Sequence, residues 1–516
     1  MFPGKEQSYS RLARRLVAVT AATWGIAASA FPTFGASNDV TISNGGLSVT
    51  FNLSWGAVVT GVANTSVAGG LNIVDSHDVG RELQTDQFLY QNINGTQQLI
   101  FNPTQAGAGG SQAYYQHPNG VQIAEVGSPV LSWTASANQF QAIITPLDYD
   151  TGNPTDWVYI ENVSINSHGV ANFHYTCYDY QPGAYTINTE IPTLYSDRTN
   201  AFMYPTSNDS PQTVTGAPTW PQPGITSHGW IGNVDIADNV GLFYTTPVGL
   251  PETYGTFPGV PVSDALPLGK TNVVEYGLAS RPGEILSSQF SVIAATQQQG
   301  PALISQQNPA TFTVQNSIIN NGVFSANAAA YTAAPGYSSG VNPAVPTGWT
   351  SSGGNTGVNG PDTVVYGGNA YQPFAPASTA GVSDFSFLQG EGAFIAQTAA
   401  TTAGQSYTLA FDAAERGGNL TAKLEVVLTN ASNGSQIVTM APTLTDAGFT
   451  PYFLNFTAVS GLSKIEFLNV SPTGIDDTVD VSNVSLVATT VPEPPALEVI
   501  AIGGLALVIA RRKRKV

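Results

Sequence analysis

The chain has one cysteine in 516 residues, Cys177, so it cannot form an intrachain disulfide. Its stability must therefore come from burial of apolar side chains and from hydrogen bonds, even if it is exported. Cys177 lies in an aromatic, strand-like run over residues 173–178. That setting favours a buried, inert thiol over a catalytic one.

Basic residues are scarce as well: the chain has 16 Lys and Arg against 34 Asp and Glu. Nine of these bases lie in residues 1–36 and 491–516, so the body between them carries seven bases, 31 acids and a net charge of −24. Such a body is expected to repel nucleic acid and anionic lipid. A neutral partner such as a sugar fits better.

Several catalytic motifs are missing. No Gly-rich phosphate loop follows a strand and opens a helix, and no Gly-x-Ser-x-Gly elbow occurs. His77, His117, His168 and His228 lack metal-ligand spacing, and each alone is more typical of a structural histidine.

The two ends have the composition of targeting segments and are set aside from fold reasoning. Lys5 and three arginines precede an apolar stretch from residue 16 to residue 30, which predicts a signal peptide over residues 1–36. Cleavage after Ala30 and cleavage after Ala36 both remain open. Arg14 and Arg15 raise the twin-arginine export route, although the general route fits the rest of the segment.

The last residues combine Pro492-Glu493-Pro494, an apolar run over residues 496–510 and a basic cluster over residues 511–515. The prolines keep the triplet out of helices and sheets, and the apolar run is at or below the roughly 17-residue minimum for a membrane span. Residues 490–516 resemble the PEP-CTERM sorting tail of Gram-negative bacteria. The resemblance implies export, transient inner-membrane insertion, recognition by an exosortase, and delivery to the cell surface or extracellular matrix. An ordinary C-terminal anchor is the alternative.

Residues 37–295 predict an all-β domain. Short runs of β-formers, such as residues 47–51 and 157–160, are broken by Gly, Asn, Asp and Pro, and no long stretch has a helical period. Four segments, at residues 77–90, 101–107, 190–195 and 229–244, follow an opening strand that leads into residues 72–75. Together they resemble the galactose-mutarotase-like supersandwich, a superfamily that includes sugar epimerases, polysaccharide lyases and domains of unknown activity.

Aromatic faces and planar polar groups are the usual means of sugar recognition. The candidate carbohydrate-binding residues are Asp78, Arg81, Gln84, Tyr90, Asn102, Gln105 and Trp230. Purely structural roles, such as an ion pair of Arg81 with Asp78 or Glu82, remain open.

A mutarotase needs a general acid and a general base on opposite sides of the sugar ring oxygen. Residues around His174 and Glu252 faintly resemble the family's histidine strand and glutamate segment, which makes these two the candidate catalytic pair. They must converge on one pocket to act on one ring. A lyase would also need a cation to neutralise a uronate, and the body has few cations.

A Gln-rich composition shift at residues 296–310 predicts a linker, with a long surface loop as the alternative, and residues 311–489 predict a second β-sandwich. Residues 321–324, 403–412 and 480–486 resemble the galactose-binding-like jelly roll. Many members of that family hold a structural Ca²⁺ through acids, for which Asp476 and Asp480 are the candidates here. Ser325 stands where the family's opening acid is expected, so acidic loops without a metal are the alternative. No other cofactor is expected.

The sequence therefore predicts an all-β exported protein with a supersandwich, a jelly roll and a removable tail. The leading hypothesis is a surface or matrix protein that binds carbohydrate or exopolysaccharide without turnover. An epimerase or lyase is the second hypothesis, and a purely structural matrix protein the third.

Overall fold

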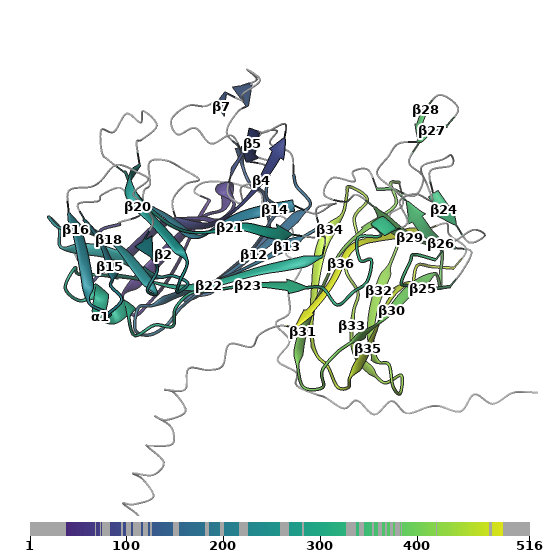
Figure 1. Cartoon of the computed structure of the whole chain (residues 1–516). Helices are drawn as coiled ribbons and strands as arrows, with labels where there is room; N and C mark the ends of the chain where they lie inside the picture. The colour runs from purple at the N-terminus through teal and green to yellow at the C-terminus, as the bar shows by residue number, and fades with distance from the viewer. Residues whose placement is uncertain are drawn as a thin grey trace, which may run out of the picture. The chain divides into compact units, whose positions relative to one another are not determined.

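The structure is a computed structural model, and Figure 1 shows the whole chain. The residues that it describes are 38–67, 69–72, 74, 83–93, 96–99, 105–106, 115–116, 122–123, 126–147, 154–180, 185–196, 201–215, 225–257, 268–280, 283–326, 337–339, 345–352, 355–359, 364–366, 369–371, 375–376, 382, 384–418, 421–473 and 477–488.

The first sandwich contains two large antiparallel sheets. Sheet I has the strand order β1-β2-β3-β4-β14-β21-β20-β17, with β5 paired to β4. Its strands are β1 (Asp39–Asn44), β2 (Leu47–Asn52), β3 (Val58–Asn64), β4 (Leu83–Ile93), β14 (Tyr185–Ser196), β21 (Leu268–Ser280), β20 (Pro251–Phe257), β17 (Ile225–Thr226) and β5 (Thr96–Leu99). A 3-10 turn, η1 (Leu53–Trp55), separates β2 from β3.

Sheet II has the order β10-β11-β12-β13-β22-β19-β18-β15-β16, with β23 paired to β22. Its strands are β10 (Val130–Ala135), β11 (Gln139–Ile144), β12 (Trp157–Ile165), β13 (Ala171–Asp179), β22 (Glu284–Ala295), β19 (Val240–Thr245), β18 (Trp230–Asp235), β15 (Ala201–Pro205), β16 (Pro211–Thr215) and β23 (Thr311–Asn316). Two short pairs lie outside the large sheets: β6 (Gln105–Ala106) with β9 (Val126–Gly127), and β7 (Tyr115–Gln116) with β8 (Gln122–Ile123).

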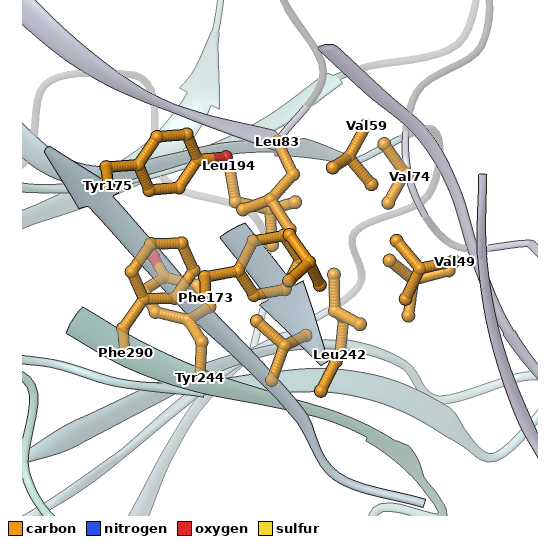
Figure 2. Packing of buried hydrophobic residues seen from close by; sticks show 14 of the residues in the cluster. Val49, Val59, Val74, Leu83, Phe173, Tyr175, Leu194, Leu242, Tyr244 and Phe290 are labelled. Atoms are coloured by element: carbon orange, nitrogen blue, oxygen red, sulfur yellow. The ribbon is translucent and has the colours of Figure 1, made fainter. Parts of the chain in front are cut away.

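The inner faces of the two sheets bury one apolar core. Alternate residues of β13, namely Phe173, Tyr175 and Cys177, point into it, because successive side chains of a strand point to opposite faces. Figure 2 shows Phe173 packed beside Tyr175 and Phe290, with Leu242 and other core residues close by. The rings of Phe173 and Phe290 stack with centroids 4.9 Å apart. The buried thiol predicted for Cys177 is confirmed.

The region predicted as a linker contains a short helix, α1 (Gly300–Ile304). Pro301 stands at its start, where a missing backbone N–H costs nothing. Beyond it, β23 pairs with β22 over residues 311–316, so sheet II continues past the composition shift. The Gln-rich stretch therefore belongs to the first sandwich, because a strand of sheet II follows it.

The second sandwich has two smaller antiparallel sheets. Sheet III runs β24-β26-β29-β36-β31-β34, and sheet IV runs β25-β30-β35-β32-β33. The strands of sheet III are β24 (Tyr337–Ser339), β26 (Thr356–Asn359), β29 (Phe385–Gln389), β36 (Thr478–Ala488), β31 (Ser406–Glu415) and β34 (Thr450–Thr457). Those of sheet IV are β25 (Thr350–Ser351), β30 (Phe394–Ala400), β35 (Leu462–Asn469), β32 (Leu424–Asn430) and β33 (Gln436–Met440), and β27 (Val364–Tyr366) pairs separately with β28 (Asn369–Tyr371).

The core of the second sandwich is also aromatic at its centre. Phe411 of β31 meets Phe467 of β35 edge-on at 5.1 Å, and Trp349 lies 6.1 Å from Phe467. The strict alternation of buried and half-buried residues in β32 and β35 places one face of sheet IV in this core and the other toward solvent. A further buried cluster combines Val158, Tyr178 and Ile285 of sheet II with Ala410 and Val487 of sheet III.

The prediction of an all-β protein, a large sandwich followed by a smaller one, is confirmed. The predicted signal peptide and the sorting tail with Pro492, Glu493 and Pro494 lie outside the described residues. Within the described part of the chain, no helix has the length and apolar character needed to cross a membrane.

Candidate functional site

A hollow of about 600 Å³ opens on the outer face of sheet II, next to α1. We call it the Trp230 hollow, and it is lined by Met203, Asp209, Pro211, Trp230, Gln297, Gln298, Pro301, Ala302 and Ser305. These residues come from β15, β16 and the turn between them, from β18, and from α1 with the residues just before and after it. One wall is therefore sheet and the opposite wall is the helix.

The floor of the hollow depends on close packing around Phe243. Trp230 is 5% exposed, and its ring meets that of Phe243 at 61° with centroids 6.2 Å apart. Glycines stand where side chains would collide with the Phe243 ring: a Cβ at Gly300 would lie 2.0 Å from it, and one at Gly232 would lie 2.4 Å away. These glycines let α1 and β18 approach the aromatic pair closely, which fixes the position of the Trp230 ring.

The rim of the hollow is polar and carries little charge. Gln298, Ser305 and Asp209 are exposed, and Gln297 is half-buried. Asp209 sits at φ +58° in the β15–β16 turn, where its N–H donates to the carbonyl of Thr206. Buried apolar groups, among them Trp230 and Pro301, with amide, hydroxyl and carboxylate groups at the exposed edge provide contacts for a neutral polyhydroxy ligand.

The two candidate catalytic residues do not converge. Phe173 and Tyr175 point into the core, so His174 between them points to the outer face of sheet II. Its Nε2 lies 2.9 Å from Ser287 Oγ. Glu252 belongs to sheet I and is fully buried on the same side of β20 as the core residue Tyr254. The geometry that an acid–base pair on one sugar ring requires is therefore not met.

Glu252 is a buried acid in its own right. Burial raises its pKa to about 7, and the nearby hydroxyls of Thr246 and Ser227 lower it only in part. No described residue gives either carboxyl oxygen a hydrogen bond of normal geometry. With the side chain at 0% exposure, it has no access to a substrate in this conformation.

A second buried acid lies on the opposite sheet. Glu161 of β12 points into the core, and Tyr175 Oη donates a 2.7 Å hydrogen bond to its Oε1. Burial raises the pKa of Glu161 to about 8, and the Tyr175 hydrogen bond offsets only part of this shift. The neutral acid is therefore the form that the fold favours at pH 7.

Sheet I also holds a buried cation that the sequence did not single out. Lys270 Nζ lies 3.6 Å from Glu190 Oε2 and 5.0 Å from the centre of the Tyr195 ring, and Thr193 Oγ1 donates to the same carboxylate oxygen. Leu194 points to the core, so Thr193 and Tyr195 point to the other face. The pairing of Tyr195 with Lys270 between β14 and β21 brings this cluster together. The distance between these residues along the chain does not predict it.

Most of the other predicted ligand residues lie outside the description. Asp78, Arg81, Asn102 and Asp476 are not among the described residues. Gln84, Tyr90 and Gln105 are described only as backbone positions in β4 and β6, where Gln84 pairs with Thr193. Of the predicted carbohydrate residues, only Trp230 is placed with its side chain, and it lines the hollow.

Asp480, the remaining metal candidate, is fully buried on β36 opposite Phe387 and Ala414. Burial raises the pKa of its carboxyl well above the usual value, and Arg416 offsets this in part. No group of three or more His, Cys, Asp or Glu side chains that could hold a metal occurs among the described residues. Asp476, its partner in the prediction, lies outside the described residues, so the Ca²⁺ site stays a prediction.

No family model and no curated protein matches this sequence. Among solved structures, a GalM/aldose epimerase homologue from C. elegans is 12% identical and covers 51% of this chain and 99% of its own, with a TM-score of 0.31. A galactose mutarotase related enzyme from Lactobacillus acidophilus is 8% identical over 50% of this chain and 97% of its own, with a TM-score of 0.32. TmCBM61, solved with β-1,4-galactotriose, is 12% identical over 34% of this chain and 100% of its own, with a TM-score of 0.21. Similarities this low assign neither a family nor a ligand.

Proposed function

We propose that this protein binds neutral carbohydrate without turnover and that the Trp230 hollow is a contact site. The observation that carries the proposal is the composition of the hollow, in which the buried Trp230 and Pro301 lie beside more exposed proline, glutamine, serine and aspartate side chains. Pyranose rings present C–H faces to aromatic surfaces, and their hydroxyls pair with side-chain amides.

The alternatives fit less well. An epimerase or lyase using His174 and Glu252 requires both groups in one pocket, and they point into different spaces on different sheets. A purely structural matrix protein needs no hollow with an aromatic floor and polar rim, and the first sandwich has one. Carbohydrate binding without catalysis therefore fits the described geometry better than either alternative.

Glycan-array binding of the full-length protein tests the proposal. Gln298→Ala, at the exposed rim, is expected to weaken glycan binding about three- to tenfold, because each lost hydrogen bond contributes roughly 0.5–1.5 kcal/mol. Gln306→Ala is the matched control, since Gln306 is equally exposed on the same segment but does not line the hollow. Absence of retention on every neutral glycan would overturn the proposal.

We also propose that the chain is exported, and that its tail is removed by an exosortase to leave the protein at the cell surface or in the matrix. The support is the sequence of the two ends, with the Pro492-Glu493-Pro494 triplet ahead of a short apolar run and a basic cluster. Intact-mass measurement of the protein recovered outside the cells is expected to show loss of both ends. A secreted form that retains residues 496–516 contradicts tail removal, and Glu493→Ala is expected to keep the tail in place.

A further inference from the structure

The outer face of sheet II carries a straight row of uncharged polar side chains. Neighbouring strands pair Thr134 with Gln141, Gln141 with Asn162, Asn162 with His174, His174 with Gln289, and Gln289 with Thr311. Cross-strand partners point to the same face of a sheet, so these residues form one line across β10, β11, β12, β13, β22 and β23. We call this line the polar row.

The polar row faces away from the core. Phe140, Val163 and Phe173, each one position from a member of the row, belong to the buried core, which directs the row to the opposite side. Thr134 and Thr311 at its ends are exposed, and the four residues between them are half-buried. Farther along the same strands, the outward residues Val158, Tyr178 and Ile285 are buried against sheet III. The row is therefore part of the surface.

No Asp, Glu, Lys or Arg occurs at any outward position of these six strands. Burial lowers the pKa of His174, so its ring is neutral at pH 7. By contrast, the solvent face of sheet IV carries Glu425, Lys464 and Glu466, with a contact between the last two. The lack of charge thus extends from the part of this face that sheet III covers to the half-buried and exposed residues of the polar row, in a chain whose net charge is −18.

The row is also ordered by hydrogen bonds. Gln141 Nε2 donates to Asn162 Oδ1 at 2.7 Å, and His174 Nε2 lies 2.9 Å from Ser287 Oγ. In the next row, Ser291 Oγ donates to Asn172 Oδ1 at 2.9 Å. Such contacts hold planar side chains in fixed orientations, which lowers the entropy lost when a ligand binds.

We propose that the polar row binds an extended, neutral β-linked polysaccharide that crosses the strands of sheet II. Adjacent strands lie about 4.7–4.9 Å apart, and a pyranose unit of an extended β-linked chain advances by a similar distance. Successive sugar units therefore meet successive strands, each with one amide, imidazole or hydroxyl group. An uncharged face on an acidic protein suits a neutral chain and disfavours a uronate polymer, which the net charge repels.

This inference rests on the register and composition of the row and not on the Trp230 hollow, although Trp230 lies farther along the same sheet on β18. The two sites also make different demands on ligand length. The hollow takes a short sugar, whereas the row gains contacts with each added unit up to the width of the strands that it crosses.

Affinity electrophoresis of the full-length protein in gels containing a soluble neutral β-glucan tests the proposal. The double variant Gln141→Glu/Gln289→Glu keeps the shape of the row and adds two charges, and it is expected to bind at least tenfold more weakly. Gln436→Glu, at an exposed position of β33 in the second sandwich, is the matched control and is expected to bind as the parent does. Thermal unfolding of each variant establishes that it is folded.

Oligosaccharide competition separates this site from the hollow. A β-linked hexaose is expected to compete at least tenfold better than the corresponding biose, and Gln298→Ala is expected to leave this length dependence unchanged. Equal competition by both sugars, or unchanged glucan binding in the double variant, overturns the polar-row proposal while leaving the hollow untouched. Self-association that the double variant abolishes, without glucan retention by the parent, would instead make the row an interface between copies and also overturn it.

Discussion

The free energy of unfolding is expected to fall as the pH rises from about 5 to about 9. Glu161 has a folded-state pKa of about 8 and an ordinary value of 4.5, so between these values the folded protein holds a proton that the unfolded chain has released. Stability therefore decreases with pH in this window and is highest below it. Glu252 and Asp412, whose pKa values burial raises to about 7, act in the same direction.

Glu161→Gln is the variant with the clearest expected effect on this dependence. A glutamine keeps the acceptor for Tyr175 Oη and cannot ionise, so the variant should be more stable than the parent at pH 9 by a few kcal/mol, since each pKa unit corresponds to about 1.4 kcal/mol. The difference should shrink toward pH 5. Denaturant unfolding at a series of pH values measures it.

Glu425→Gln supplies the control for the pH experiment. Glu425 is half-buried on the solvent face of β32, and its replacement should shift the stability curve little and without a slope in pH. If Glu161→Gln and the parent lose stability in parallel between pH 6 and pH 9, then Glu161 ionises in the folded state without cost and the expected mechanism is wrong.

Phe173→Ala is expected to lower the free energy of unfolding by about 3–5 kcal/mol. The ring is 1% exposed and packs beside those of Tyr175 and Phe290, at centroid distances of 6.3 and 4.9 Å (Figure 2). Alanine leaves a cavity that neither neighbour fills without leaving its stacked position, because a β-sandwich core is held from both sheets. Thermal or denaturant unfolding gives the magnitude.

Thr398→Ala serves as the surface control, because Thr398 is exposed on β30 and a change there should stay within about 0.5 kcal/mol. Phe173→Leu should lie between the alanine variant and the parent. A Phe173→Ala protein as stable as the parent would mean that the two sheets close over the lost ring, contrary to the packing described.

Much of the fold is readable from the residue order. The alternation of apolar and polar residues in β12, β13 and β32 predicts strands with one buried face, and frequent Gly, Pro, Asn and Asp predict the turns between them. One cysteine is enough to exclude an intrachain disulfide framework, and a charge of −24 in the body predicts a neutral rather than a polyanionic partner. These features are local, so the sequence determines them without knowledge of strand pairing.

The candidate sites depend instead on which strands become neighbours. The sequence around His174 and Glu252 resembles a catalytic pair. In the structure, however, His174 points outward from sheet II and Glu252 is buried on sheet I. The Lys270–Glu190 cluster and the polar row arise from register between strands that are far apart in sequence, such as β13 with β22. A shift of register by one residue reverses the face to which every side chain of a strand points.

Composition, local alternation and terminal motifs thus determine the fold class, the acidic body and the expected export of this protein. The tertiary structure alone decides that Trp230 lines a hollow, that Glu161 and Glu252 are buried acids, and that an uncharged row crosses six strands. The physical reason is that burial and side-chain facing are set by long-range strand pairing, whose register no single segment of the sequence records.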